Sequence, residues 1–544
     1  MNIPASSAGP DQTPAFTDTA ACREWLAKAP RSDAVQFHAM LLRQANLLNG
    51  LALPATERLD ILEALRDTVH AAQEDIARRF TGKPLPLAAA EKVAFDSCRA
   101  LWQAFAGGYM RCVEACLANE AGMKPKAPLI VQRAMAALVA EQLEAHRAGQ
   151  AVRPDHWRVL HQLYAAGEQL EAIQQEVTDT PRLGKTPGNA LSAYIEALLL
   201  QAASLHEHSQ RHVVWIARWA RHWAPKVRLL AAPPTLSTRA IPLCVDLASD
   251  QPAGNKPLAG DGARWLETAE LMRSLKKRLI LLEQGEAPAK LHLGDDCTQP
   301  SCEIVLKNVY QRWCKGGAIR GYERRPASGS CKFIGGTEAV HYYLSGSKPF
   351  KQPGAKDSDV MRREREEIAT FGRVSSHRDE NFSEQQGYAV ESWELLENWH
   401  MVDTSTTGMR LAHQTTQPGG RVGHGLLVAA CPADAQDYLL GSVRWALLVG
   451  DDTVQAGVHF FPGKPEPVAV RTLDPGAGNE KFRQGFLLPE IAALKSAASV
   501  VLPVGSFKLQ RIVEIFAAGQ SRKLRLTRLL ERGADFERAA YEPA

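Results

Sequence analysis

The sequence predicts a multidomain α + β protein, with an N-terminal all-α helical bundle or short solenoid and a C-terminal antiparallel β-barrel that carries an additional small β module. From residue 21 to about residue 225, apolar residues recur at three- and four-residue steps, which is the period of an amphipathic helix. From residue 320 onward, short apolar runs alternate with glycine-containing turns, as in antiparallel strands. At 544 residues the chain is also too long for one ordinary domain.

Changes in composition divide the chain into five segments. We expect a flexible tail over residues 1–20, a helical domain over 21–230, an α/β connector over 231–319, a β-barrel over 320–465 with a polar insertion at 345–386, and a β-rich extension over 466–544. The connector contains two amphipathic helical patterns, which we interpret as packing against the barrel.

The helical domain is expected to contain about seven antiparallel helices. The sequence shows no clean repeat period, so a regular tetratricopeptide array is not supported. Trp215, Trp219 and Trp223 recur every fourth residue and form an aromatic stripe. We interpret this stripe as sealing its helix onto the bundle. The alternative is a ridge that docks a partner, because Arg218 and Arg221 interleave with it.

Composition excludes several classes of protein. A formal net charge of +4 argues against a surface for duplex nucleic acid, which needs a concentrated basic face. The sequence shows neither a signal-peptide pattern nor an apolar run of about 18 residues, so we expect a cytoplasmic protein without a membrane span. The ten cysteines are scattered and are expected to be reduced, with Cys112 and Cys116 as small buried residues.

Fragments of enzyme and metal-site motifs occur, but each lacks a required part. Gly184-Lys-Thr186 resembles the end of a phosphate-binding loop, yet Asp179 stands where that motif needs glycine. One histidine and three cysteines have spacings that fit no compact zinc knuckle: His292, Cys297, Cys302 and Cys314. We therefore expect no catalytic residue, no metal and no enzyme activity.

Three motifs follow one another between residues 320 and 461. The first is an arginine pair, Arg320 and Arg324, with Arg325 directly after it. The second is the turn Asp403-x-Ser405-x-x-Gly408. The third is a pair of strands, Leu440-Gly-Ser-Val-Arg-Trp445 and Val454-Gln-Ala-Gly-Val-His-Phe-Phe461.

In this order the motifs resemble those of the PilZ domain family of cyclic di-GMP receptors. The resemblance covers about a quarter of the chain and implies a six-stranded barrel with the ligand, cyclic di-GMP, between the arginine loop and the turn. The residues that it assigns to ligand binding are Arg320, Arg324, Arg325, Asp403, Ser405 and Gly408. It implies no other cofactor.

The chemistry of these residue types suits that ligand. A guanidinium can donate two parallel hydrogen bonds to guanine O6 and N7 or to phosphate oxygens. Asp403 can accept from guanine N1–H and N2–H, and Ser405 can donate to phosphate or stabilise the turn. Gly408 permits a positive φ and a close backbone approach.

One departure from the family pattern concerns spacing. Asp403 follows Arg324 by 79 positions, and we place the excess in the insertion 345–386, which either loops out or covers the site. Arginines inside the insertion, Arg362, Arg363 and Arg365, are competing candidates for the clamp. Further basic residues near the C-terminus are interpreted as a solvated strand face, with an anion-contacting face as the alternative: Lys508, Arg511, Arg522, Lys523, Arg525 and Arg528.

Three functional hypotheses follow. The first is a cyclic di-GMP effector that signals through the helical domain to a protein partner. The second is an adaptor or chaperone-like scaffold with a degenerate barrel that binds no nucleotide. The third is binding of single-stranded nucleic acid, which the low net charge disfavours.

Overall fold

The structure is a computed structural model, and it describes residues 13–184, 186–234, 242–317, 323–353, 396–473, 481–494 and 496–544. The chain forms two compact units, one of residues 1–83 and 87–321, the other of residues 84–86 and 322–544. Pro84–Pro86 belongs to the second unit because Leu85 forms a β-bridge with Val422 and Arg421 donates to the carbonyl oxygens of Pro84 and Pro86. The finer five-part division stays a prediction.

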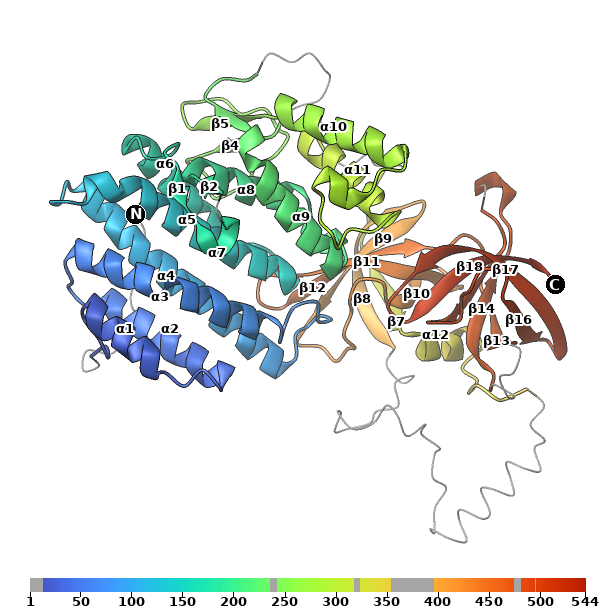
Figure 1. Ribbon diagram of the computed structural model, residues 1–544. Helices are drawn as coiled ribbons and strands as arrows, with labels where there is room; N and C mark the ends of the chain where they lie inside the picture. Colours follow the sequence, from blue (N-terminus) through green and yellow to red (C-terminus); the bar gives the residue numbers. More distant parts are fainter. Residues whose placement is uncertain are drawn as a thin grey trace, which may run out of the picture. The chain divides into compact units, whose positions relative to one another are not determined.

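The first unit is helical, as the sequence predicts (Figure 1). Its helices are α1 (Thr19–Lys28), α2 (Ala34–Gly50), α3 (Ala55–Ala77), α4 (Ala89–Leu117), α5 (Ala127–Arg147), α6 (Pro154–Gln169), α7 (Thr180–Leu183), α8 (Ala190–Ala202), α9 (Gln210–Trp223), α10 (Ala269–Glu283) and α11 (Ser301–Cys314). Two small sheets accompany them, β1 (Val177–Thr178) with β2 (Pro187–Gly188), and β5 (Ala263–Glu267) between β3 (Arg228–Leu230) and β4 (Cys244–Asp246). Among the described helices, none is long and apolar enough to cross a membrane.

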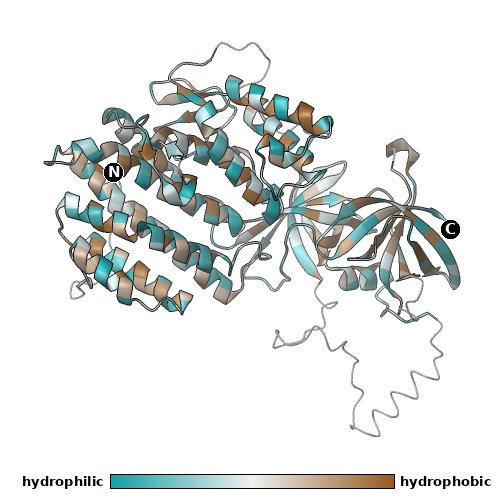
Figure 2. Cartoon of the chain, in the orientation of Figure 1, coloured by the Kyte–Doolittle hydropathy of each residue, from teal (hydrophilic) through white to brown (hydrophobic). Residues whose placement is uncertain are grey.

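The apolar faces of these helices form one continuous core. Figure 2 shows apolar and polar residues alternating along the helices, and the apolar positions of α3, such as Leu59, Leu62 and Val69, are buried. Cys112 and Cys116 are buried in the same core, as expected. Burial of one helical face, rather than intrinsic propensity, supplies most of the stability of such a bundle.

The tryptophan stripe of α9 lies inside this core. Trp215, Trp219 and Trp223 are at most 1% exposed, Trp219 Nε1 donates to the carbonyl oxygen of Leu293, and the Trp313 ring meets Trp223 edge-on. The stripe therefore seals the helix, as interpreted, and the alternative of a docking ridge is wrong.

Two expectations need correction. The connector helices α10 and α11 were expected to pack on the barrel, but their apolar faces, including Leu275 and Leu306, lie in the core of the first unit. The loose tail was expected over residues 1–20, but Phe16 is buried and its ring lies 5.3 Å from that of Trp25. Burial of the Phe16 ring beside Trp25 offsets part of the conformational entropy that this short segment loses on ordering.

A buried ion network joins the hairpin β1–β2 to the helices. Asp179 is fully buried and its carboxylate binds Arg66, Arg182 and the side-chain amide of Gln132. Arg182 Nη2 also forms an ion pair with Glu196 Oε2 at 2.6 Å. Burial alone would raise the pKa of Asp179, but the charges of Arg182 and Arg66 outweigh burial and hold that pKa below its usual range.

Two histidines of this unit make its stability sensitive to acid. Burial lowers the pKa of His146 to about 3, and burial and nearby arginines lower that of His70 to about 3. Below pH 6.5 the two histidines are protonated in the unfolded chain but stay neutral in the folded chain. The free energy of unfolding therefore falls as the pH falls toward 3, by about 1 kcal/mol per pH unit for each histidine. We expect His146→Leu to lose less stability than the native chain between pH 7 and pH 5.

Urea unfolding followed by circular dichroism at the two pH values measures this difference. Among the described residues neither ring nitrogen of His146 has a hydrogen-bond partner, so leucine removes the titration without breaking a bond. Replacement of the exposed His400 by leucine is the control and should leave the pH dependence of the helical unit unchanged. An equal acid loss in the native chain and His146→Leu would contradict the prediction.

The second unit contains two closed antiparallel β-barrels, which confirms the predicted fold class. The strands of the first barrel are β6 (Arg325–Pro326), β7 (Ser330–Gly335), β8 (Glu397–Ser405), β9 (Gly408–Gln414), β10 (Leu427–Pro432), β11 (Leu439–Val449) and β12 (Thr453–Phe460). Its strand order is β8-β7-β10-β11-β12-β9, and β9 pairs back to β8. The short strand β6 pairs with the C-terminal end of β8, whereas β7 pairs with its N-terminal half.

The predicted small β module is a complete second barrel. Its strands are β13 (Glu466–Thr472), β14 (Arg483–Leu488), β15 (Ser499–Pro503), β16 (Ile512–Ala517), β17 (Gln520–Arg532) and β18 (Phe536–Pro543), which close in the order β13-β14-β15-β18-β17-β16. One apolar cluster contains residues of both barrels, for example Ile334 and Phe461 with Phe486 and Phe536. Helix α12 (Thr337–Leu344) contributes Val340 to it.

Part of the predicted insertion lies outside the described residues. Its first residues are described up to 353, and Gln352 exchanges two hydrogen bonds with the backbone of Phe482 on the second barrel. The competing arginines Arg362, Arg363 and Arg365 are not among the described residues.

Candidate ligand-binding site

The turn between β8 and β9 carries three of the residues that the sequence singles out. Asp403 and Ser405 stand at the end of β8, and Gly408 begins β9. Strand β6 runs alongside, with Arg325 opposite Thr404 and Pro326 opposite Asp403. This pairing brings Arg324 beside Asp403 although 79 positions separate them.

The carboxylate of Asp403 lies between two arginines. Arg324 Nη1 donates to Asp403 Oδ1 at 2.9 Å, and Arg410 Nε forms an ion pair with Asp403 Oδ2 at 2.8 Å. The carboxylate is 13% exposed, while the side chains of Arg324 and Arg410 are 40% and 35% exposed. The acid is thus held in place, and both cations keep a solvent-facing side that can meet an anion.

Gly408 is required because two backbones approach closely. A Cβ atom at this position would lie 2.5 Å from the carbonyl oxygen of Val458 on β12. The φ angle of Gly408 is not in the left-handed region, so the expectation of a positive φ was wrong and only the expectation of close approach holds. Ser405 Oγ donates to the carbonyl oxygen of Gly408 at 3.3 Å and so stabilises the turn.

Asp403 belongs to a row of residues that crosses four strands of the barrel. Asp403 on β8 lies opposite Arg410 on β9, Arg410 opposite Gly457 on β12, and Gly457 opposite Trp445 on β11. The neighbours Leu411 and Val458 are buried, so by the alternation of strand residues this row faces outward. A Cβ atom on Gly457 would lie 2.1 Å from Trp445 Nε1, which means that the indole covers this glycine.

Arg410 and Trp445 belong to this row beside Asp403, and the sequence analysis did not propose them. Arg410 stands two positions after Gly408 in Gly408-Met-Arg410, and side chains two apart on a strand share a face. Trp445 was considered only as part of the sequence pattern of the closing pair of strands. A glycine opposite a tryptophan was the available signal for an aromatic platform at this position.

Of the two remaining predicted residues, the structure describes Arg325 but not Arg320. Arg325 is exposed, and its backbone takes part in the β6–β8 pairing. Arg320 lies outside the described residues, so its position relative to Asp403 stays a prediction. The structure therefore brings together Arg324, Asp403 and the turn, with Arg325 on the adjacent strand.

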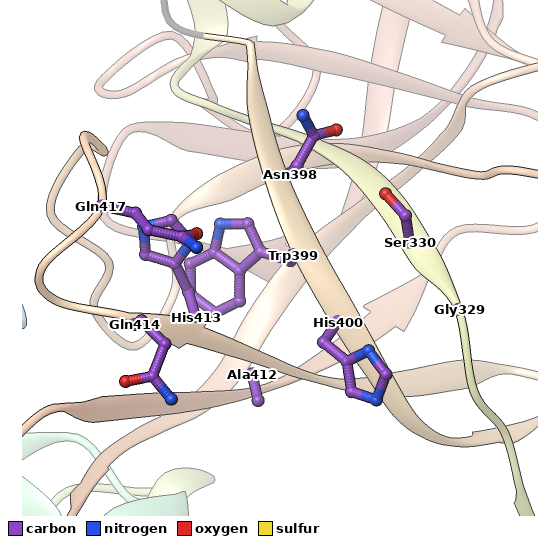
Figure 3. Close-up of a pocket in the computed structure, with 9 residues that line it drawn as sticks. All are labelled: Gly329, Ser330, Asn398, Trp399, His400, Ala412, His413, Gln414 and Gln417. Atoms are coloured by element: carbon purple, nitrogen blue, oxygen red, sulfur yellow. The ribbon is translucent and has the colours of Figure 1, made fainter.

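A pocket of about 460 Å³ opens along β8 and β9, on the N-terminal side of Asp403 (Figure 3). Its polar lining includes Ser330, Asn398 and His400. Figure 3 shows the rings of Trp399 and His413 face to face, and their centroids are 5.1 Å apart. Trp399 Nε1 donates to Glu397, whose pKa is raised by burial. These buried rings make a rigid base for the strands that carry the site.

Metal chemistry has no support in the described part of the chain. No group of three or more histidine, cysteine, aspartate or glutamate side chains is placed to hold a metal ion there. Cys297, from the zinc set considered above, uses its thiol to donate to the carbonyl oxygen of Leu293.

Comparison with known proteins finds a matching family for most of the helical unit and another for the second barrel. Residues 20–234 match the family described as "Cyclic-di-GMP receptor FimW, N-terminal domain", and residues 468–544, which form the second barrel, match "FimW C-terminal beta-barrel domain". The cyclic-di-GMP receptor FimW of Pseudomonas aeruginosa is 24% identical over an alignment of length 565 that includes gaps and covers 96% of this chain and 90% of that protein. The chain is therefore similar to FimW in the N-terminal and C-terminal domains of that family and over nearly its whole length.

Proposed function

We propose that this chain is a cyclic di-GMP receptor, not an enzyme, and that its first barrel is a PilZ-like domain. The observation that carries the proposal is the Asp403 carboxylate held between Arg324 and Arg410 at a glycine turn. The similarity to a receptor named for this ligand supports it.

The dinucleotide has groups that match each part of the row. The guanine edge offers N1–H and N2–H to the carboxylate of Asp403, and its O6 and N7 accept from an arginine fork. The phosphodiesters are anions that suit Arg324, Arg325 and Arg410. The face of Trp445 can stack against a purine ring.

Binding has to displace a bond that already exists. Arg324 donates one hydrogen bond to Asp403 Oδ1, where an N–H of guanine would also donate, so the base takes the place of this arginine at the carboxylate. The released guanidinium is then free to bind guanine O6 and N7 or a phosphate. We propose that this exchange moves the segment before β6, and that the shift in population is passed through the helical domain to a protein partner.

Calorimetric titration of the full chain with cyclic di-GMP tests the proposal. We expect Asp403→Ala to weaken binding tenfold or more, because hydrogen bonds to a charged group contribute about 1.5–3 kcal/mol. Asp451→Ala, which removes an exposed aspartate from the same barrel, is the control and should keep native affinity. Absence of heat with the native chain would contradict receptor function.

Arg324→Ala separates two roles of this arginine. If Arg324 contacts the ligand, the variant binds more weakly than the native chain. If Arg324 only competes for Asp403, the variant binds more tightly. That result would show that Arg324 does not hold the ligand.

A further inference from the structure

Strands β8 and β9 pair along only part of their length, and a pocket opens where the pairing stops. Their ladder ends at His400 opposite Ala412. Beyond that point β8 stays paired with β7, and β9 stays paired with β12. The pocket of about 460 Å³ described above lies between the two separated strand ends (Figure 3). We call it the β8–β9 pocket, and it is lined mainly by residues 398–400 of β8 and 412–414 of β9.

One residue of this lining, His413, has a buried ring whose nitrogen atoms are unpaired. The residue is 8% exposed, and neither Nδ1 nor Nε2 has a hydrogen-bond partner among the described residues. Buried polar atoms are nearly always hydrogen-bonded, so an unpaired ring that lines a pocket points to an occupant that completes its bonds. A neutral imidazole has one donor and one acceptor nitrogen, so the occupant should offer both kinds of group.

The ring of His413 is held in a fixed orientation. It stacks on Trp399, with ring centroids 5.1 Å apart and 21° between the planes. A Cβ atom on Gly419 would lie 2.8 Å from His413 Nε2 and 3.0 Å from Glu397 Oε2, so the loop backbone fits closely against both side chains. Gly420 N donates to Glu397 Oε1 at 2.7 Å and fixes this loop. A site that is already ordered loses little conformational freedom when a ligand binds.

Most of the other polar side chains of the pocket are uncharged, and each can both donate and accept hydrogen bonds. They are Ser330, Asn398, Gln414 and Gln417. Such groups match a ligand that carries donors and acceptors side by side. A guanine base has this pattern, because O6 and N7 accept while N1–H and N2–H donate. Its planar ring also suits a pocket that is walled by the rings of Trp399 and His413.

The β8–β9 pocket adjoins the Asp403 row on the outer face of the barrel. Arg410 and Ala412 are two positions apart on β9, so they share a face and lie about 7 Å apart. The exposed His400 lies opposite Ala412, as Asp403 lies opposite Arg410. A dinucleotide with one base at Asp403 can therefore place its other base in the pocket. The volume falls within the range of about 300–1,000 Å³ for small-molecule sites, so a base with its ribose has room.

We propose that the β8–β9 pocket binds a guanine base. The base comes either from the cyclic di-GMP molecule whose first guanine is held at Asp403, or from a separate guanine nucleotide. The first source rests on the proposed receptor function, and the second does not. In both cases His413 gains hydrogen-bond partners when the base binds.

Calorimetric titration of the full chain with cyclic di-GMP tests the first source. We expect His413→Phe to bind about tenfold more weakly, because it keeps a ring against Trp399 but removes both nitrogen atoms. The matched control is His222→Phe, which makes the same change at an exposed position of the helical unit and should keep native affinity.

A second variant guards against misfolding of His413→Phe. Asn398 and Gln417 are exposed, so the double variant Asn398→Ala, Gln417→Ala should fold. We expect it to weaken binding by a similar factor, because it removes two amides from the lining.

Titration with guanosine monophosphate tests the second source. It is carried out on Asp403→Ala, with and without His413→Phe, so that only the pocket differs. Loss of nucleotide binding on addition of His413→Phe, with cyclic di-GMP affinity unchanged by His413→Phe alone, supports a separate nucleotide.

Two results would overturn the pocket as a base site. One is native affinity of both pocket variants for both ligands, which would indicate that water alone completes His413. The other is equal weakening in the control His222→Phe. Absence of cyclic di-GMP binding by the native chain contradicts the receptor function instead, and guanosine monophosphate then decides on the pocket by itself.

Discussion

Replacing Asp179 with alanine should lower the free energy of unfolding of the helical unit by about 3–5 kcal/mol. The carboxylate of Asp179 is fully buried and is shared by Arg66, Arg182 and Gln132. Its removal leaves the buried guanidinium of Arg66 without a carboxylate, since Arg182 retains Glu196 but Arg66 has no second acidic partner within the described parts of the chain. An unpaired buried charge costs far more than the pair contributes.

Urea unfolding followed by circular dichroism at a helix wavelength measures this loss. The matched control is Asp250→Ala, whose partner Arg158 is 47% exposed, and an exposed pair contributes about 0–1 kcal/mol. Should the Asp179→Ala variant fail to fold, the variant Arg66→Leu, Asp179→Asn is expected to recover part of the helical signal, because it removes the unpaired charge. Equal, small losses of unfolding free energy in Asp179→Ala and Asp250→Ala would show that the buried network stabilises the unit no more than an exposed ion pair does.

Gly408→Val is expected to weaken cyclic di-GMP binding by about a hundredfold, which corresponds to about 2.8 kcal/mol. The new Cβ would lie 2.5 Å from the carbonyl oxygen of Val458, and a strand backbone cannot yield as a flexible side chain can. The β8–β9 turn must therefore shift, which moves Asp403 and Ser405 away from Arg410. The same strain should lower the stability of the barrel by about 1–3 kcal/mol.

Calorimetric titration and thermal unfolding of the same samples separate the two effects. Gly254→Val is the control, because no atom lies within 4 Å of the position of its Cβ and its φ is not positive. It should bind the ligand as the native chain does. Native affinity in Gly408→Val would show that the ligand does not use this turn.

The sequence predicted the local features of the fold well and the long-range ones poorly. The helical faces of α3 and the burial of Trp219 follow from spacing alone, because a helix face is set by residues three and four apart. Asp179, by contrast, appeared in the sequence only as a residue that spoils a phosphate-binding loop. Its partner Arg66 stands 113 positions away, and no local pattern reports such a pair.

The candidate site shows the same division. The Asp403 turn is compact in sequence and could be read from it, whereas the proximity of Arg324 to Asp403 depends on the register of β6 against β8. Arg410 was missed because its spacing places it on the same strand face as Gly408, but its contact with Asp403 depends on the register of β8 against β9. The closure of the second barrel depends on the pairing of β13 with β16, and strand patterns alone do not specify which strands meet.

The shortness of β6 has a consequence for how the chain could signal. Only Arg325 and Pro326 pair with β8 in this strand, while β7 and β9 keep the barrel closed on their own. Detachment of the segment that carries Arg324 would therefore break two residue pairs, the hydrogen bond from Ala327 N to the carbonyl oxygen of Val402, and the Arg324–Asp403 hydrogen bond, while the closing strand pairs remain. Under the proposed function, a ligand that displaces this segment would have to break only the few contacts of β6 and would leave the closure of the barrel unchanged.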